Sequence, residues 1–118
     1  MARDRCFDFA EAERGGEVDR PALEAEWLHL TRTALPEAAR GHSDWPVALD
    51  HCFQRILLDH AVGGRWYDHV QARPAYRHIT ADALARAIAL GRTVLAGEAD
   101  LAALNRRSLE WREKRRGA

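Results

Sequence analysis

A base, a cation and a carboxylate recur at four-residue spacing in the middle of the sequence: His51, Arg55 and Asp59. Residues four apart lie next to one another on one side of an α-helix. The spacing therefore predicts a polar stripe that could bind an anion or relay a proton. A solvated or interhelical face, with an ordinary Arg55–Asp59 ion pair, explains the same pattern.

The segment after this stripe contains further groups that could hold an anion. Gly63-Gly64 stands directly before an expected short helix, where backbone amides together with Arg65 could hold a phosphate or carboxylate; a structural turn is the alternative. The loops that follow add cations and one aromatic ring: Arg73, Tyr76, Arg77 and His78. We expect the stripe and residues 63–78 to form the surface that recognises a protein partner or a small anionic ligand.

Five histidines stand nine residues apart, but their spacing does not favour a metal site: His42, His51, His60, His69 and His78. Nine residues turn a helix by about 900°, so consecutive members would point to opposite sides. Cys52 stands beside His51, but neighbouring residues on a helix diverge by about 100°, and Cys52 falls in an apolar stripe. We therefore predict no metal ligands and assign no catalytic residues.

The C-terminal region carries a cluster of arginines that could contact nucleic-acid phosphates: Arg106, Arg107, Arg112, Arg115 and Arg116. Glu110 and Glu113 interleave with them, and the whole chain has eighteen basic and eighteen acidic residues. A DNA-associated module is accordingly a weaker hypothesis.

Length and composition favour one small globular domain in the cytoplasm. The chain has 118 residues, of which 47% are hydrophobic and 31% charged. It shows no apolar run of the roughly 20 residues that cross a bilayer, no signal peptide, and only two cysteines without a recognisable motif. Residues 1–19 are acidic and polar, which predicts a flexible N-terminal arm ahead of a single helical domain at 20–118.

The apolar periodicity predicts an all-α fold, a small bundle of four to five helices. A first helix should begin after Asp19 and break or kink at Pro36. A central helix is expected at 46–62, closed by Gly63, and a short one at 65–71. Residues 76–79 should be extended or form a turn.

Two more helices follow from clear start and stop signals. Thr80 should cap a helix that Gly97 closes, and Asp100 should cap the last helix, whose tail is basic. Alternation typical of strands is limited to a few residues, so the sequence favours helices throughout.

Several short motifs resemble a family of short proteobacterial proteins labelled GNAT-type N-acetyltransferases. The similarity covers residues 50–112 and is carried by these motifs: Asp50-His51-Cys52-Phe53 with Arg55-Ile56, Trp66, Arg73-Pro74-Ala75, and Leu104-Asn105-Arg106-Arg107-Ser108-Leu109 with Trp111-Arg112. The resemblance implies acyl transfer with acetyl-coenzyme A as cofactor. The Arg/Gln-x-x-Gly-x-Gly/Ala motif of GNAT enzymes does not occur in the sequence, so no catalytic residue is carried over.

The sequence thus leaves two main functional classes. We expect a small helical binding or adaptor protein, because the sequence offers neither a cofactor cradle nor a credible nucleophile–base pair. The alternative is an acyltransferase that uses acetyl-coenzyme A, or a protein associated with one.

Overall fold

A computed structural model describes residues 19–117, with side chains described as far as Glu113. Within this range the chain is helical and contains no strand. The elements are α1 (Arg20–His29), a π-helical turn (Leu30–Ala34), α2 (Leu35–Ala39), α3 (Asp50–Val62), a 3-10 turn (Trp66–Asp68), α4 (Ala75–His78), α5 (Ala81–Leu95) and α6 (Leu101–Gly117). The predicted all-α fold is confirmed. The predicted arm, apart from its last residue Asp19, lies outside the described residues.

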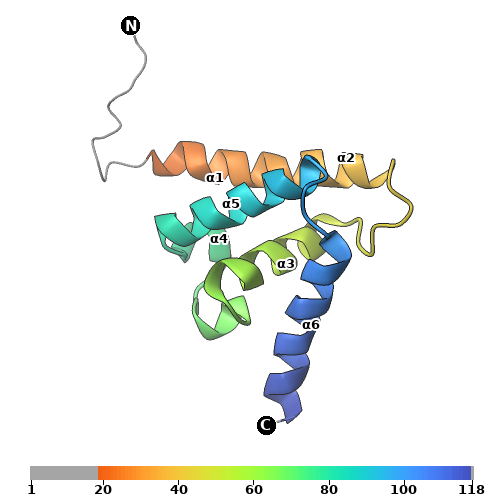
Figure 1. The fold of residues 1–118 in the computed structure, drawn as a ribbon. Helices are drawn as coiled ribbons and strands as arrows, with labels where there is room; N and C mark the ends of the chain where they lie inside the picture. Colours follow the sequence, from red (N-terminus) through yellow and green to blue (C-terminus); the bar gives the residue numbers. More distant parts are fainter. Residues whose placement is uncertain (1–18, 118) are drawn as a thin grey trace, which may run out of the picture.

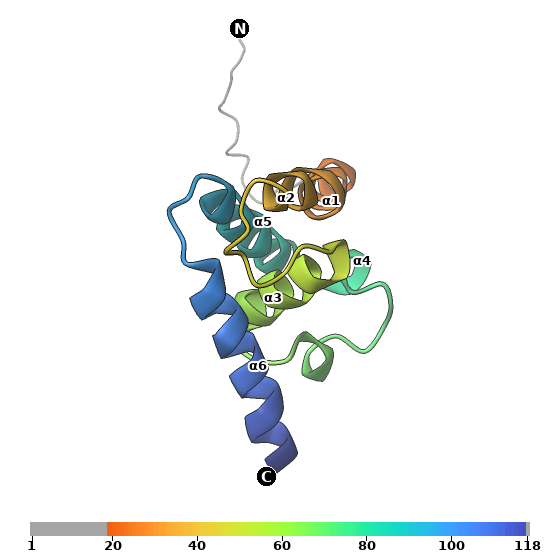
Figure 2. The same cartoon turned by 90° about the vertical axis from the view of Figure 1, so that its right-hand side faces the viewer.

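Three long helical rods, formed by α1 to α2, by α3 and by α5, pack around one core. A fourth helix, α6, extends away from this core (Figure 1). The rod formed by α1, the π-helical turn and α2 lies against α5, and α5 lies against α3 (Figure 1). Viewed at 90° to this direction, the three rods form a triangle (Figure 2). Helix α6 packs on α3, and its C-terminal half projects beyond the other helices in both views.

Local signals for helix ends are confirmed. The side chains of Asp19, Thr80 and Asp100 each accept a hydrogen bond from the backbone amide three residues later, at 3.2 Å in each case. Gly63 and Gly97 follow the ends of α3 and α5 with φ of 76° and 77°. Glycine adopts this left-handed conformation without the steric cost of a Cβ atom.

The sequence predicted a break or a kink at Pro36, and the structure excludes the break, because the chain remains helical from Arg20 to Ala39. The helix widens just before the proline, and the Leu35 amide bonds to the Leu30 carbonyl, five residues back. Proline has no amide hydrogen and its ring clashes with the carbonyl four residues earlier in a regular α-helix. A wider turn at this point accommodates the proline without ending the helix.

Three other boundaries differ from expectation. Helix α3 begins at Asp50 rather than at residue 46, because Trp45 and Val47 pack on the core from the preceding loop. The helix expected at 65–71 is only the 3-10 turn at 66–68. Residues 75–78 form α4, directly after a cis Arg73–Pro74 peptide bond.

The core lies between α1, α3 and α5. Its large apolar side chains that are fully buried are Trp27, Leu35, Phe53, Ile56, Leu57 and Leu84. Gly91 allows α5 to approach the π-helical turn closely, since a Cβ atom there would lie 2.5 Å from Cδ2 of Leu30. None of the helices within residues 19–117 combines the length and apolar content that crossing a bilayer requires.

Candidate functional site

Helix α3 carries the predicted polar stripe, but its three members lie at different depths. His51 is exposed and lies 3.7 Å from the carboxylate of Asp50. Arg55, one turn later, is half-buried, and Asp59 is fully buried. The stripe therefore leads from the surface into the interior, and its residues have different partners.

The buried carboxylate of Asp59 joins α3 to α6 and to the 3-10 turn. It accepts hydrogen bonds from the Ser108 hydroxyl at 2.6 Å and from the Trp66 backbone amide at 2.9 Å. The Arg112 guanidinium donates two more, at 3.0 and 3.1 Å. A buried charge needs such pairing and hydrogen bonding to be tolerated. We refer to Asp59, Ser108 and Arg112 as the buried joint.

Arg55 does not form the predicted direct ion pair with Asp59, whose ionic partner is Arg112. Its guanidinium donates instead to the Ser108 hydroxyl at 2.8 Å and to the Asn105 side-chain oxygen at 2.7 Å. Both acceptors are neutral. The Arg55 guanidinium is therefore held in position. It is linked to the Asp59 carboxylate only through the Ser108 hydroxyl, which lies between them.

A cleft of about 490 Å³ opens beside Arg55. It lies between α1 with the π-helical turn, α3, and the segment from the 3-10 turn to α4. The lining residues are Trp27, Arg32, His51, Gln54, Arg55, Leu58, Trp66, Arg73, Pro74, Ala75 and Tyr76. This lining contains three arginines and a histidine but no acidic residue. Its walls are otherwise largely apolar and aromatic.

Contacts between distant segments shape the cleft. Arg20 at the start of α1 donates to the Tyr76 carbonyl at 2.7 Å, which ties α4 to α1. Gln54 donates to the Thr31 hydroxyl at 2.9 Å. The Arg73 guanidinium lies over the Trp66 ring, 5.3 Å from its centre. The cleft thus presents an aromatic surface with a cation already placed on it.

The Gly63-Gly64-Arg65 segment is occupied by internal contacts. The amides of Gly63 and Gly64 both donate to the Asp59 backbone carbonyl, at 2.8 and 3.0 Å. Arg65 donates to both carboxylate oxygens of Asp68, and this hydrogen bonding raises the pKa of the guanidinium. These groups close the end of α3 and do not face the cleft.

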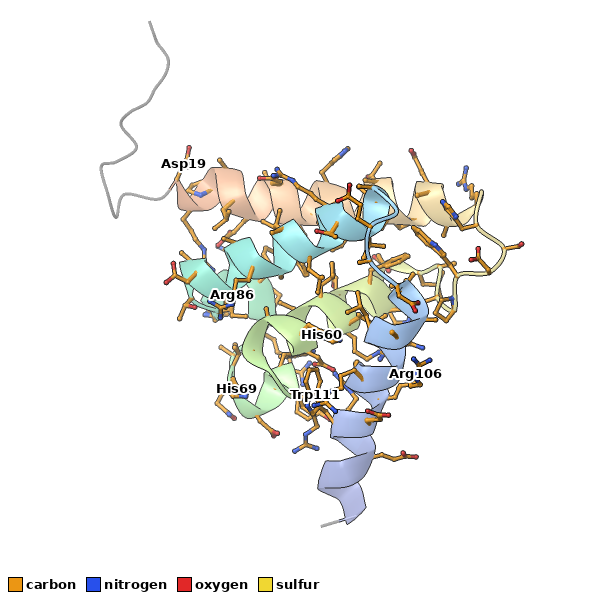
Figure 3. All side chains as sticks on the ribbon, in the orientation of Figure 1. Asp19, His60, His69, Arg86, Arg106 and Trp111 are labelled. Atoms are coloured by element: carbon orange, nitrogen blue, oxygen red, sulfur yellow. The ribbon has the colours of Figure 1, made fainter. Side chains whose placement is uncertain are left out.

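Four of the ten residues predicted for the ligand surface line the cleft: His51, Arg55, Arg73 and Tyr76. Arg77 is exposed outside it, and His78 borders a separate hollow with His69 and Arg86. Figure 3 shows His69 and Arg86 at the same end of the molecule. The Arg86 guanidinium is used there to donate to the Ala61 carbonyl at 2.9 Å.

Two cleft residues outside the predicted surface, Arg32 and Gln54, supply polar groups. Arg32 comes from the π-helical turn, 19 residues before the first member of the stripe, His51, and no local spacing connects it with α3. Gln54 stands next to Arg55 in sequence, but a single glutamine on a helix carries no signal of its own.

The predicted nucleic-acid arginines have mixed environments. Arg112 is paired with Asp59, and Arg107 lies 3.5 Å from the Glu110 carboxylate. Arg106 is exposed and points away from α3 (Figure 3). Arg115 and Arg116 lie in the last turns of α6, beyond the described side chains.

His60 makes further contacts between α3 and α6. Its Nε2 lies 2.9 Å from the Leu104 carbonyl, and its ring meets that of Trp111 edge to face at 4.9 Å (Figure 3). This histidine is therefore a packing residue. Among residues 19–113, no group of three or more histidine, cysteine or acidic side chains is arranged to hold a metal ion.

Comparison of the chain with protein-family models, with curated proteins and with solved structures finds no match.

Proposed function

We propose that this protein binds a small organic anion in the cleft beside Arg55. The observation that carries the proposal is the charge of the lining, which has four basic residues and no acidic one. A concave surface of one sign with apolar walls raises the local potential and attracts ligands of the opposite charge. Its volume of about 490 Å³ falls in the usual range for small-molecule sites.

The chemistry of the lining favours binding over catalysis. The side chains supply guanidinium groups, an amide and aromatic rings, which orient and hold a ligand. His51 is one possible general base, but the lining includes no serine, threonine or cysteine that it could activate. We therefore place the protein among binding proteins rather than covalent catalysts.

The proposal is tested by thermal unfolding in the presence of organic anions, comparing the wild-type chain with Arg73→Gln. A ligand that binds only the folded state adds about 2.7 kcal/mol of stability at a hundredfold excess over Kd, and Tm rises with the logarithm of the ligand concentration. Arg106→Gln removes an exposed arginine outside the cleft and serves as the matched control. If the ligand raised Tm equally in Arg73→Gln and in wild type, the anion would not bind in the cleft and the proposal would be wrong.

Acetyl-coenzyme A is the second candidate ligand, because its phosphates suit the same three arginines. It belongs in the same titration, followed by an assay for release of free coenzyme A with amine acceptors. A Tm shift with release supports acyl transfer. A shift without release leaves acetyl-coenzyme A as one anion among those that the cleft binds.

A further inference from the structure

We infer that the cleft takes a ligand of nucleoside-monophosphate type, in which a flat heteroaromatic ring is joined to a terminal phosphate monoester. This inference rests on the proposed function and makes it more specific. It follows from the number of unneutralised guanidinium groups, the rigidity of one of them, and the aromatic and amide groups that stand beside them.

The positive charge of the cleft lining favours a ligand with more negative charge than a single carboxylate carries. Arg32 and Arg73 form no ion pair within the described part of the chain, and Arg55 contacts only neutral oxygens. Three guanidinium groups therefore share one cleft without a carboxylate. A phosphate monoester carries about −1.5 to −2 charges near pH 7 and offers three acceptor oxygens. Guanidinium forks match this geometry with paired hydrogen bonds.

Arg55 is the best-positioned phosphate ligand among the three. Two of its five N–H donors are bound to Ser108 and Asn105, and three remain. A cation that is already fixed loses little conformational entropy when a ligand binds. Arg32 is exposed and can move onto the same anion from the rim, while Arg73 adds its charge from its position over the Trp66 ring.

The aromatic part of the lining suits a flat ring. Trp66 and Tyr76 are half-buried at the cleft, and Arg73 already lies over the Trp66 ring at 5.3 Å. Rings of nucleobases stack on aromatic side chains and on guanidinium planes. The pair formed by Trp66 and Arg73 therefore provides a stacking surface next to the phosphate site.

Gln54 adds a group that could read the edge of such a ring. One of its two amide hydrogens is bound to the Thr31 hydroxyl. The other hydrogen and the carbonyl oxygen have no partner in the described residues, which leaves a donor and an acceptor on one side chain. A glutamine amide of this kind pairs with the donor–acceptor edge of adenine.

The test is isothermal titration calorimetry of the full chain with AMP, adenosine, ribose 5-phosphate and 1-naphthoate. AMP should bind at least about tenfold more tightly than adenosine or ribose 5-phosphate, because only AMP engages both parts of the cleft. Arg55→Gln and Arg73→Gln should each weaken AMP binding about tenfold or more. Arg106→Gln should leave it unchanged. If Arg55→Gln folds poorly, Arg73→Gln and Arg32→Gln, at exposed positions, carry the test.

The outcomes separate this inference from the proposed function. If 1-naphthoate binds as tightly as AMP and Arg73→Gln weakens it, the cleft binds anions but the phosphate inference is wrong. If ribose 5-phosphate binds as tightly as AMP, the cleft does not bind the adenine ring and the inference is also wrong. If none of the four compounds, nor any anion of the thermal-unfolding series, binds at millimolar concentration, both the inference and the proposed function are overturned.

Discussion

The buried joint and the cleft use the same residue type in opposite ways. At the joint, Arg112 donates two hydrogen bonds to the carboxylate of Asp59, so the two charged groups neutralise each other and are not available to a ligand. At the cleft, the guanidinium groups of Arg32 and Arg73 have no carboxylate partner in the described residues and line a hollow. The difference shows that the role of an arginine here depends on whether an acid reaches it.

Arg55 connects the two regions. Its guanidinium lines the cleft, while its hydrogen bond to Ser108 joins it to the carboxylate of Asp59. The joint thereby fixes the position of a cation that a ligand would use. This link makes the comparison testable, because changes at the joint should affect both folding and binding, whereas changes at the cleft should affect binding alone.

The largest effect is expected for Asp59→Asn. The substitution removes the charge that pairs with Arg112. It also replaces one of the two accepting carboxylate oxygens with an NH₂ group, which is a donor and cannot accept the hydrogen bonds made there. Breaking a buried ion pair from one side costs about 3–5 kcal/mol, and since Arg112 is partly exposed we expect about 3 kcal/mol. Urea unfolding measures the change, with exposed Asp50→Asn as the matched control. A loss under about 1 kcal/mol would mean that the joint is not structural.

A smaller loss is expected for Ser108→Ala. The buried hydroxyl donates to Asp59 and accepts from Arg55, so its removal leaves both partners short of a hydrogen bond. An unsatisfied buried group costs about 1–3 kcal/mol, and Arg55 should also become less well positioned. We expect reduced stability in urea together with weaker anion binding by calorimetry. Ser43→Ala, in an exposed loop, is the control; unchanged binding in Ser108→Ala would break the link between the two regions.

The sequence predicted the features that depend on neighbours along the chain. The caps at Thr80 and Asp100 and the end of α3 at Gly63 are local hydrogen-bond or backbone preferences, so spacing was sufficient. The partner of Asp59 could not be predicted in this way. Arg112 stands 53 residues later, and only the packing of α6 on α3 brings it to the carboxylate.

The same distinction applies to the candidate site. The polar stripe on α3 was visible as four-residue spacing, but the pattern gave no depth, and burial separates Asp59 from His51. Arg32 reaches the cleft from a wide helical turn before Pro36, where the sequence predicted a break or a kink. The cleft thus depends on tertiary contacts among three segments, which no single segment encodes.

The cleft arginines should contribute little to stability. Arg73 is exposed and, within the described residues, its only close partner is the Trp66 ring, so Arg73→Gln should change the free energy of unfolding by no more than about 0.5 kcal/mol. Arg112→Gln is the matched comparison, because it removes the ionic partner of Asp59 and should destabilise clearly. Parallel urea titrations of the two variants give the contrast. Equal losses would show that Arg73 supports the fold and would weaken its assignment to ligand binding.

The smallest effect on binding is expected for Arg65→Ala. Arg65 stands next to the glycines that resembled an anion cradle, yet its guanidinium is held by Asp68, and the adjacent amides are bound to the Asp59 carbonyl. The hydrogen bonds to Asp68 raise the pKa of the Arg65 guanidinium, which therefore stays protonated near neutral pH. Affinity for AMP, or for any anion that the cleft binds, should therefore stay within about twofold of wild type. A loss of affinity as large as that of Arg73→Gln would place the anion site at the end of α3 rather than in the cleft. The paired Arg65, and not the unpaired Arg73, would then be the arginine that binds the ligand.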